Sequence, residues 1–315
     1  MNMTETMLAL LPAHSKNAPY DMFGQQAPHT NDQTAHAAQD ASASKLHRTI
    51  AALEQQRKIY HEDGNRQAEA NTLGDLGHAA YRLGDVQQAI RAYTQCLKLV
   101  RWLDDAEGQG NVLDSLGNVF VALGEPEKAR TFYQQASTIR HDLGDHAGQA
   151  NTLNHLGHVL LSLREQRQAL GAFEQELTLR RRLDDQAGIA NALHNQATAY
   201  AEMGKQQQAL GLYEQSLQMA QDAGDQQHQA MICWNIGLLY RKQKNLPRAL
   251  ASMQQALACM HACGEEKTAA YAAQVAQIQQ QIEQHEATNR RWGNVRQMTS
   301  KLKEAILGSE RSSQD

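Results

Sequence analysis

Asparagine is the residue with the most regular spacing among those that could bind a ligand. Asn71, Asn111, Asn151 and Asn191 stand 40 residues apart, each two positions before a leucine. An amide carries both a hydrogen-bond donor and an acceptor. A row of amides at a fixed spacing can therefore clamp the backbone of an extended peptide and leave its side chains free to vary. The alternative is that each asparagine caps its helix or bonds the adjacent repeat, since Asn is a favoured capping residue.

Three histidines are the next candidates for chemistry. His155, His158 and His194 could lie near one another across two units, an arrangement that would fit a metal ion or a pH-dependent contact. No cysteine or paired acid completes a ligand set, and Cys259 and Cys263 stand at apolar positions of the repeat. We therefore expect no metal and no cofactor.

Signatures of catalysis are missing from the sequence. It has no glycine-rich phosphate loop after a strand and no Gly-x-Ser-x-Gly elbow, and its His and Asp residues show no arrangement beyond the repeat. The sequence therefore predicts a protein that is not an enzyme.

Composition excludes several classes of partner and location. The net charge of -4 and the pI near 6.4 give no general attraction to nucleic acid or to anionic lipid. The N-terminal apolar run lacks a preceding positive charge, and no stretch has the roughly 18 apolar residues of a membrane span. The four cysteines resemble no secreted disulfide framework. We expect a cytoplasmic protein with reduced cysteines and no nucleic-acid or membrane partner.

The 40-residue step organises most of the chain. A Leu-Gly or Ile-Gly pair, a small alanine and an aromatic residue recur in phase with the asparagines. Their positions are Leu76-Gly77, Leu116-Gly117, Leu156-Gly157 and Ile236-Gly237; Ala89, Ala129, Ala169, Ala209 and Ala249; and Tyr93, Tyr133, Phe173 and Tyr213. Five units therefore span about residues 71–270.

Each unit is predicted to be a pair of amphipathic helices. Apolar residues recur at three- and four-residue steps in two stretches of every unit, which places each set on one helix face. Glycine marks the turns, at Gly84 and Gly124 within units and at Gly144 and Gly224 between them. Glycine suits a left-handed C-cap, and the Asp that follows, as at Asp145, can cap the next helix.

Glycine inside a helix needs a compensating reason, because it costs roughly 1 kcal/mol relative to alanine. Gly77, Gly117, Gly157 and Gly237 all lie within the first helix of their units. We expect the paired helix to approach closely there, at its small alanine.

These residues carry a resemblance to a known family. A first helix with Leu-Gly-x-x-Tyr/Phe and a second with Ala-x-x-x-Tyr are similar to the tetratricopeptide signature over about two thirds of the chain. The 40-residue step resembles the long-helix variety of Pins/LGN adaptors, kinesin light chains and bacterial regulators. The resemblance implies an all-α, right-handed α-solenoid.

The resemblance also implies a binding surface, since first helices line the concave groove in this family. Besides the four asparagines and the three histidines, it assigns Asn195, Trp234, Asn235 and Arg241 to that groove. We expect Trp234 to be an exposed interface anchor; packing against the second helix of its own unit is the alternative.

The ends of the chain are predicted to differ from the repeats. Residues 1–45 have too few large apolar side chains to offset the entropy of ordering, so we expect disorder. Residues 46–286 form the solenoid, with capping helices at 46–62 and 268–285. Residues 287–315 form a weakly ordered tail, in which Val295, Met298, Leu302 and Ile306 could build a short amphipathic helix that docks or self-associates.

The sequence thus predicts a non-catalytic scaffold or adaptor that binds a peptide segment of a protein partner. Two alternatives stay open. One is a regulatory protein that senses a small peptide or metabolite in the groove, and the other is a structural protein that assembles end to end.

Overall fold

Helices separated by short turns make up the computed structural model, which describes residues 32–264 and 268–311. The predictions for residues 1–31 fall outside this part. The helix bounds are α2 Asp32–Glu62, α3 Arg66–Leu83, α4 Val86–Trp102, α5 Ala106–Ala122, α6 Pro126–Leu143, α7 His146–Ser162, α8 Gln166–Arg182, α9 Gln186–Glu202, α10 Gln206–Asp222, α11 Gln226–Lys242, α12 Leu246–Ala262 and α13 Ala269–Arg311.

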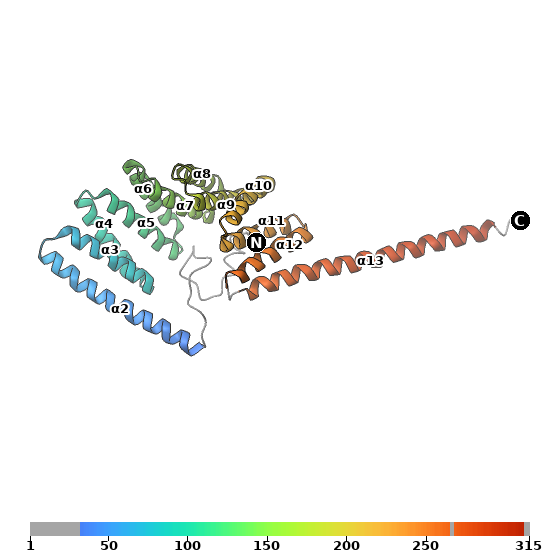
Figure 1. The fold of residues 1–315 in the computed structure, drawn as a ribbon, viewed down its shortest axis with the longest axis horizontal. Helices are drawn as coiled ribbons and strands as arrows, with labels where there is room; N and C mark the ends of the chain where they lie inside the picture. The colour runs from blue at the N-terminus through green and yellow to red at the C-terminus, as the bar shows by residue number, and fades with distance from the viewer. Residues whose placement is uncertain (1–31, 265–267, 312–315) are drawn as a thin grey trace. The chain divides into compact units, whose positions relative to one another are not determined.

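Consecutive helices pack against each other, as a repeat of helix pairs requires. Contacts join α2 to α3 and continue helix by helix to α9, then join α11 to α12 and α12 to α13. By its internal contacts the chain divides into two compact parts, each larger than one repeat unit: Met1–Met219 and Ala220–Asp315. In the first of these two parts, Figure 1 shows the helices in two layers, with α4, α6 and α8 in one layer and α3, α5 and α7 in the other. The predicted all-α solenoid of helix pairs is confirmed.

The turns follow a 20-residue step, one for each helix. The residues with positive φ are Gly64, Gly84, Asp104, Gly124, Gly144, Arg164, Asp184, Gly204, Gly224, Lys244 and Gly264. Where the sequence lacks glycine, as at Arg164 (φ 62°) and Lys244 (φ 60°), the turn keeps the same left-handed geometry. The predicted caps are present as well, since Gly144 has φ 70° and the Asp145 side chain accepts from the Gly148 N–H.

Close approach at the helical glycines is confirmed. The small alanine takes part only at Gly237, where a Cβ would lie 2.5 Å from Met253 and 3.2 Å from the backbone oxygen of Ala249; at the other three glycines an aromatic ring approaches instead. A Cβ on Gly77 would lie 2.6 Å from the Tyr93 ring, and one on Gly117 would lie 2.5 Å from the Tyr133 ring. The Phe173 ring lies closer still over Gly157. In these three units the large ring of the second helix therefore fills the space that glycine leaves.

Both ends are more helical than predicted. Helix α2 begins at Asp32, not at residue 46, and α13 runs without a break from Ala269 to Arg311 where a cap and a separate tail were expected. Alanine and glutamine are common in both segments, and their helix propensity does not depend on burial. The side chains of Val295, Met298, Leu302 and Ile306 lie outside the described part of the structure.

No helix in the described residues is both long and apolar enough to cross a membrane.

Candidate functional site

Four asparagines occupy the same place on successive first helices. Asn71 lies on α3, Asn111 on α5, Asn151 on α7 and Asn191 on α9, and all four are exposed. The two residues that follow each of them are buried, because they turn toward the core. The predicted solvent-facing amides are therefore present; we call these four residues the asparagine row.

Two arginines on the second helices reach the middle of this row. Arg140 on α6 donates from Nη2 to Asn111 Oδ1 at 2.9 Å. It also donates from Nη1 to Asp145 Oδ2 at 2.6 Å. Asp145 caps α7 with its other oxygen, so Arg140 joins one unit to the start of the next.

The same connection recurs one unit later. Arg180 on α8 donates from Nη2 to Asn151 Oδ1 at 2.6 Å and from Nη1 to Asp185 Oδ2 at 2.9 Å. Asp185 in turn caps α9 through the Gly188 N–H. Asn111 and Asn151 therefore bond within their own units through arginines that also bridge to the next unit, which supports part of the alternative interpretation of these asparagines.

Each arginine also faces a second acid, which lies on the preceding helix for Arg140 and on the arginine's own helix for Arg180. Asp114 on α5 accepts from Arg140 Nη2 at 2.8 Å and from the Thr152 hydroxyl at 2.9 Å. Burial raises the pKa of Asp114, against the opposing effects of Arg140 and Thr152.

Around Arg180 the corresponding acid is Glu176, on the same helix α8. It is fully buried, accepts from Asn154 Nδ2 at 3.1 Å and lies 3.7 Å from Arg180 Nε. Asn154 stands where Asp114 stands in the preceding unit. Burial raises the pKa of Glu176 to about 7.

The histidines lie against aromatic rings. The ring centroids are 5.5 Å apart for His155 and Tyr133, and 5.4 Å apart for His158 and Phe173. Burial lowers the pKa of His155, and lowers that of His158 to about 4, so both imidazoles are neutral near pH 7. His194 lies similarly against Tyr213 and is buried. In the described residues, no group of three or more His, Cys, Asp or Glu is placed to hold a metal ion.

The predicted exposure of Trp234 is wrong. Trp234 is 3% exposed and packs edge-on against Tyr271 of α13, with ring centroids 4.6 Å apart. Helix α13 thus places Tyr271 against Trp234, which the sequence predicted to be exposed and available to a partner. Asn235 is buried as well, and Arg241 in the last turn of α11 is partly exposed.

Asn195 on α9 is 2% exposed, unlike the asparagine four residues before it. Its equivalent on α7, His155, is partly exposed. The predicted residues therefore separate into an exposed row of asparagines and a more buried set that includes His194, Asn195, Trp234 and Asn235.

Sequence reasoning missed Arg140 and Arg180. A signal for them exists, because Arg-x4-Asp-x2-Gly occurs at Arg140, Asp145 and Gly148 and again 40 residues later. The glycine is required there, since a Cβ at Gly148 would collide with the Arg140 guanidinium. A glycine in the first turn of a helix that has no positive φ is a useful signal, because it indicates that a side chain from elsewhere occupies the place where a Cβ would lie.

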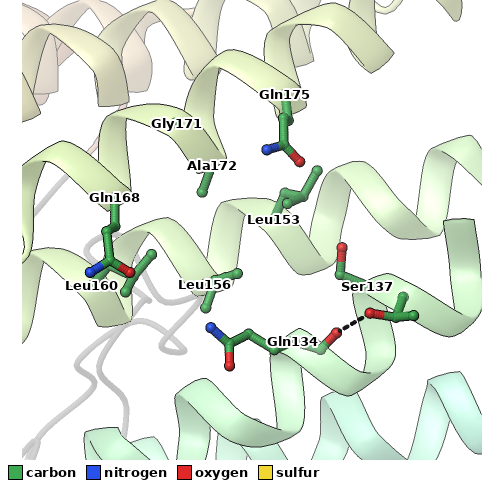
Figure 2. A pocket seen from close by; sticks show the side chains of 10 residues that line it. Gln134, Ser137, Leu153, Leu156, Leu160, Gln168, Gly171, Ala172 and Gln175 are labelled. Atoms are coloured by element: carbon green, nitrogen blue, oxygen red, sulfur yellow. Dashed lines mark hydrogen bonds between the residues drawn. The ribbon is translucent and has the colours of Figure 1, made fainter.

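A separate hollow lies between α6, α7 and α8 (Figure 2). Three largely buried leucines of α7, Leu153, Leu156 and Leu160, contribute its apolar lining. The remaining lining residues are Gln134, Ser137, Thr138, Gln168, Gly171, Ala172 and Gln175. None of these lining residues is charged, so the hollow offers apolar contact and neutral hydrogen bonds.

Comparisons with known proteins agree with the repeat. Residues 72–107, 108–182 and 168–222 match profiles described as tetratricopeptide repeat. The crystal structure of BtubC (BKLC) from P. vanneervenii superposes with a TM-score of 0.60 at 22% identity, covering 70% of this chain and 92% of that one. The apo form of RapI superposes with a TM-score of 0.61 at 14% identity, covering 72% and 86%. No curated protein sequence matches this chain. At these identities the two structures support the fold alone.

Proposed function

We propose, from the premise that this chain carries tetratricopeptide repeats, that it is a non-catalytic scaffold or adaptor that binds an extended peptide of a protein partner along its first helices. The repeat fold itself indicates a role in protein–protein interaction. The peptide and its binding surface are the further step that we propose.

The asparagine row is the observation that carries the proposal. An exposed asparagine at the same place on each of α3, α5, α7 and α9 gives a repeating set of hydrogen-bonding groups on successive first helices. An extended peptide has a repeating set of backbone N–H and C=O groups to match it. Because such contacts involve the backbone, they tolerate variation in the partner's side chains.

Asn71 and Asn191 are the positions at which to test the proposal. Replacing Asn111 or Asn151 by alanine would also remove a hydrogen bond to Arg140 or Arg180. Among the described residues, Asn71 accepts from Gln67 of its own helix at 3.3 Å and bonds no arginine, and Ala220 occupies the sequence position for Asn191 that Arg140 and Arg180 occupy for their asparagines. The double variant N71A/N191A therefore removes two exposed amides with little effect on the contacts between units.

The experiment is a selection of random linear dodecapeptides by the intact chain, followed by affinity measurements on the peptide that is enriched most. N71A/N191A is expected to bind that peptide about 5- to 150-fold more weakly, because two hydrogen bonds of about 0.5–1.5 kcal/mol each are lost. The matched control is Q135A/Q215A, which removes two exposed amides from the second helices α6 and α10 and should bind normally. Failure to enrich any peptide, or equal affinity of all three proteins, would overturn the proposal.

A further inference from the structure

The two arginines determine which way the central amides of the asparagine row point. Oxygen and nitrogen of an Asn side chain are usually assigned from their surroundings. Arginine has only N–H donors and no acceptor. The atoms of Asn111 and Asn151 that bond Arg140 and Arg180 are therefore their oxygens, and each NH2 group is directed away from the arginine.

Both arginines are themselves fixed in place. Their side chains are 12% and 15% exposed, and each guanidinium is tied through Nη1 to the Asp that caps the next helix. A second acid, Asp114 or Glu176, lies on another side of each group. An arginine held at several points cannot turn away to let the amide flip.

The outer members of the row are not constrained in this way. The arginine position is Val100 for Asn71 and Ala220 for Asn191. Asn71 Oδ1 accepts from Gln67 Nε2 at 3.3 Å, and a glutamine amide can itself turn and exchange donor for acceptor. Asn71 and Asn191 can therefore offer either end of the amide.

We infer that Arg140 and Arg180 are positioning residues that make the centre of the asparagine row a donor-only site, which takes backbone carbonyl oxygens of the bound peptide. The inference rests on the proposed function and assigns the chemistry of recognition within it. Among the described residues, none accepts a hydrogen bond from Nδ2 of Asn111 or Asn151, and both side chains are exposed. Each NH2 group is thus available to an incoming acceptor.

Charge selects the kind of acceptor. Next to Asn111, the single positive charge of Arg140 is shared by Asp114 and Asp145, at 2.8 and 2.6 Å. This excess of negative charge disfavours a carboxylate, since like charges close together repel. A neutral carbonyl carries no such penalty, so the peptide backbone fits the site better than an acidic side chain does.

The decisive variant is N111D/N151D. Aspartate has the shape of asparagine and still accepts from Arg140 and Arg180, but it has no NH2 group. The new carboxylates bond Arg140 and Arg180 more strongly than an amide does, but the one at position 111 also lies close to the like charges of Asp114 and Asp145, so we expect the melting temperature of the variant to fall by no more than about 5 °C. Its affinity for the peptide selected by the intact chain should fall at least tenfold, because two donors become acceptors that face carbonyl oxygens.

Other readings predict different results for the same protein. If Asn111 and Asn151 only join the units, N111D/N151D binds the selected peptide normally. If the peptide instead donates to these side chains, N111D/N151D binds as tightly or more tightly. Either result overturns the inference and leaves the proposed function in place, whereas failure to select any peptide overturns both.

A double-mutant cycle tests the role of the arginines. R140Q/R180Q should weaken binding severalfold, because a glutamine can donate or accept and no longer holds the amide in one orientation. Measured well below its melting temperature, this loss should be non-additive with that of N111D/N151D if the arginines act through the asparagines. Additive losses of affinity would show that the arginines do not act through these amides, and would overturn their assignment as positioning residues.

Discussion

At the scale of single residues, one buried carboxyl group makes the stability of the folded chain depend on pH. Glu176 is fully buried, and burial raises its pKa from 4.5 to about 7, against the opposing effects of Asn154 and Arg180. Asp185 lies near enough to raise it as well. The folded chain therefore holds a proton on Glu176 over a pH range in which the unfolded chain has released it.

The sign of the pH effect follows from this difference in bound protons. Between about pH 4.5 and 7 the folded state binds more protons than the unfolded state at this site, so its contribution to stability falls as the pH rises and levels off above pH 7. E176Q stays neutral and keeps an acceptor for Asn154. We expect the stability of E176Q relative to the parent chain to increase across this range, reaching on the order of 3 kcal/mol at pH 8.

Urea unfolding at pH 5, 6, 7 and 8 measures this difference. The control is E174Q, which neutralises an exposed acid on the same helix and should show no comparable trend. If E176Q is instead less stable than the parent chain at pH 8, the ion pair with Arg180 outweighs the cost of burying the charge.

At the scale of helices, pairing depends on which glycines face a ring. A Cβ at Gly157 of α7 would collide with the Phe173 ring of α8, and the rings of Tyr93 and Tyr133 occupy the same place in earlier units. Gly171 of α8 is different, since a Cβ there would meet no atom within 4 Å.

The two glycines are expected to respond to alanine in opposite directions. G157A should destabilise the chain by about 1–3 kcal/mol, because the ring and the helix must move apart. G171A should leave stability unchanged or raise it by up to about 1 kcal/mol, because alanine has the higher helix propensity. Thermal unfolding of both variants checks this, and a G157A protein as stable as G171A would contradict the close packing of α7 and α8.

At the scale of the whole molecule, the buried core is shorter than the helical chain. Among the described residues, the first buried apolar side chain is Ile50 and the last is Ile278. The helical segments outside 46–286 add length but no described core residue. The described core therefore lies between residues 46 and 286.

Residues 46–286 alone are expected to fold. Each helix pair contacts mainly its neighbours, so removing both ends leaves the internal contacts intact. Circular dichroism should show a strongly helical spectrum, and the melting temperature should stay close to that of the full chain. An unfolded or strand-rich spectrum would contradict the domain boundaries, and a much lower melting temperature would show that the end segments contribute to the core.

The sequence by itself determined the repeat, the helix pairs and the turns. These depend on residues close together in the chain, such as Gly144 and Asp145 at a cap, or on a step that recurs, such as that of Asn111 and Asn151. It also placed the asparagine row on the exposed side of the first helices, because the apolar residues beside each asparagine must face the core.

Only the tertiary structure decided what those residues contact. Arg140 lies 29 positions after Asn111, and Tyr271 lies 37 after Trp234, so neither contact follows from local spacing. The hydrogen bond from Arg140 fixes one amide, and the ring of Tyr271 covers a tryptophan expected to be free. Periodicity fixes which face of a helix a side chain occupies, whereas its orientation and burial depend on long side chains from other helices that reach the same point.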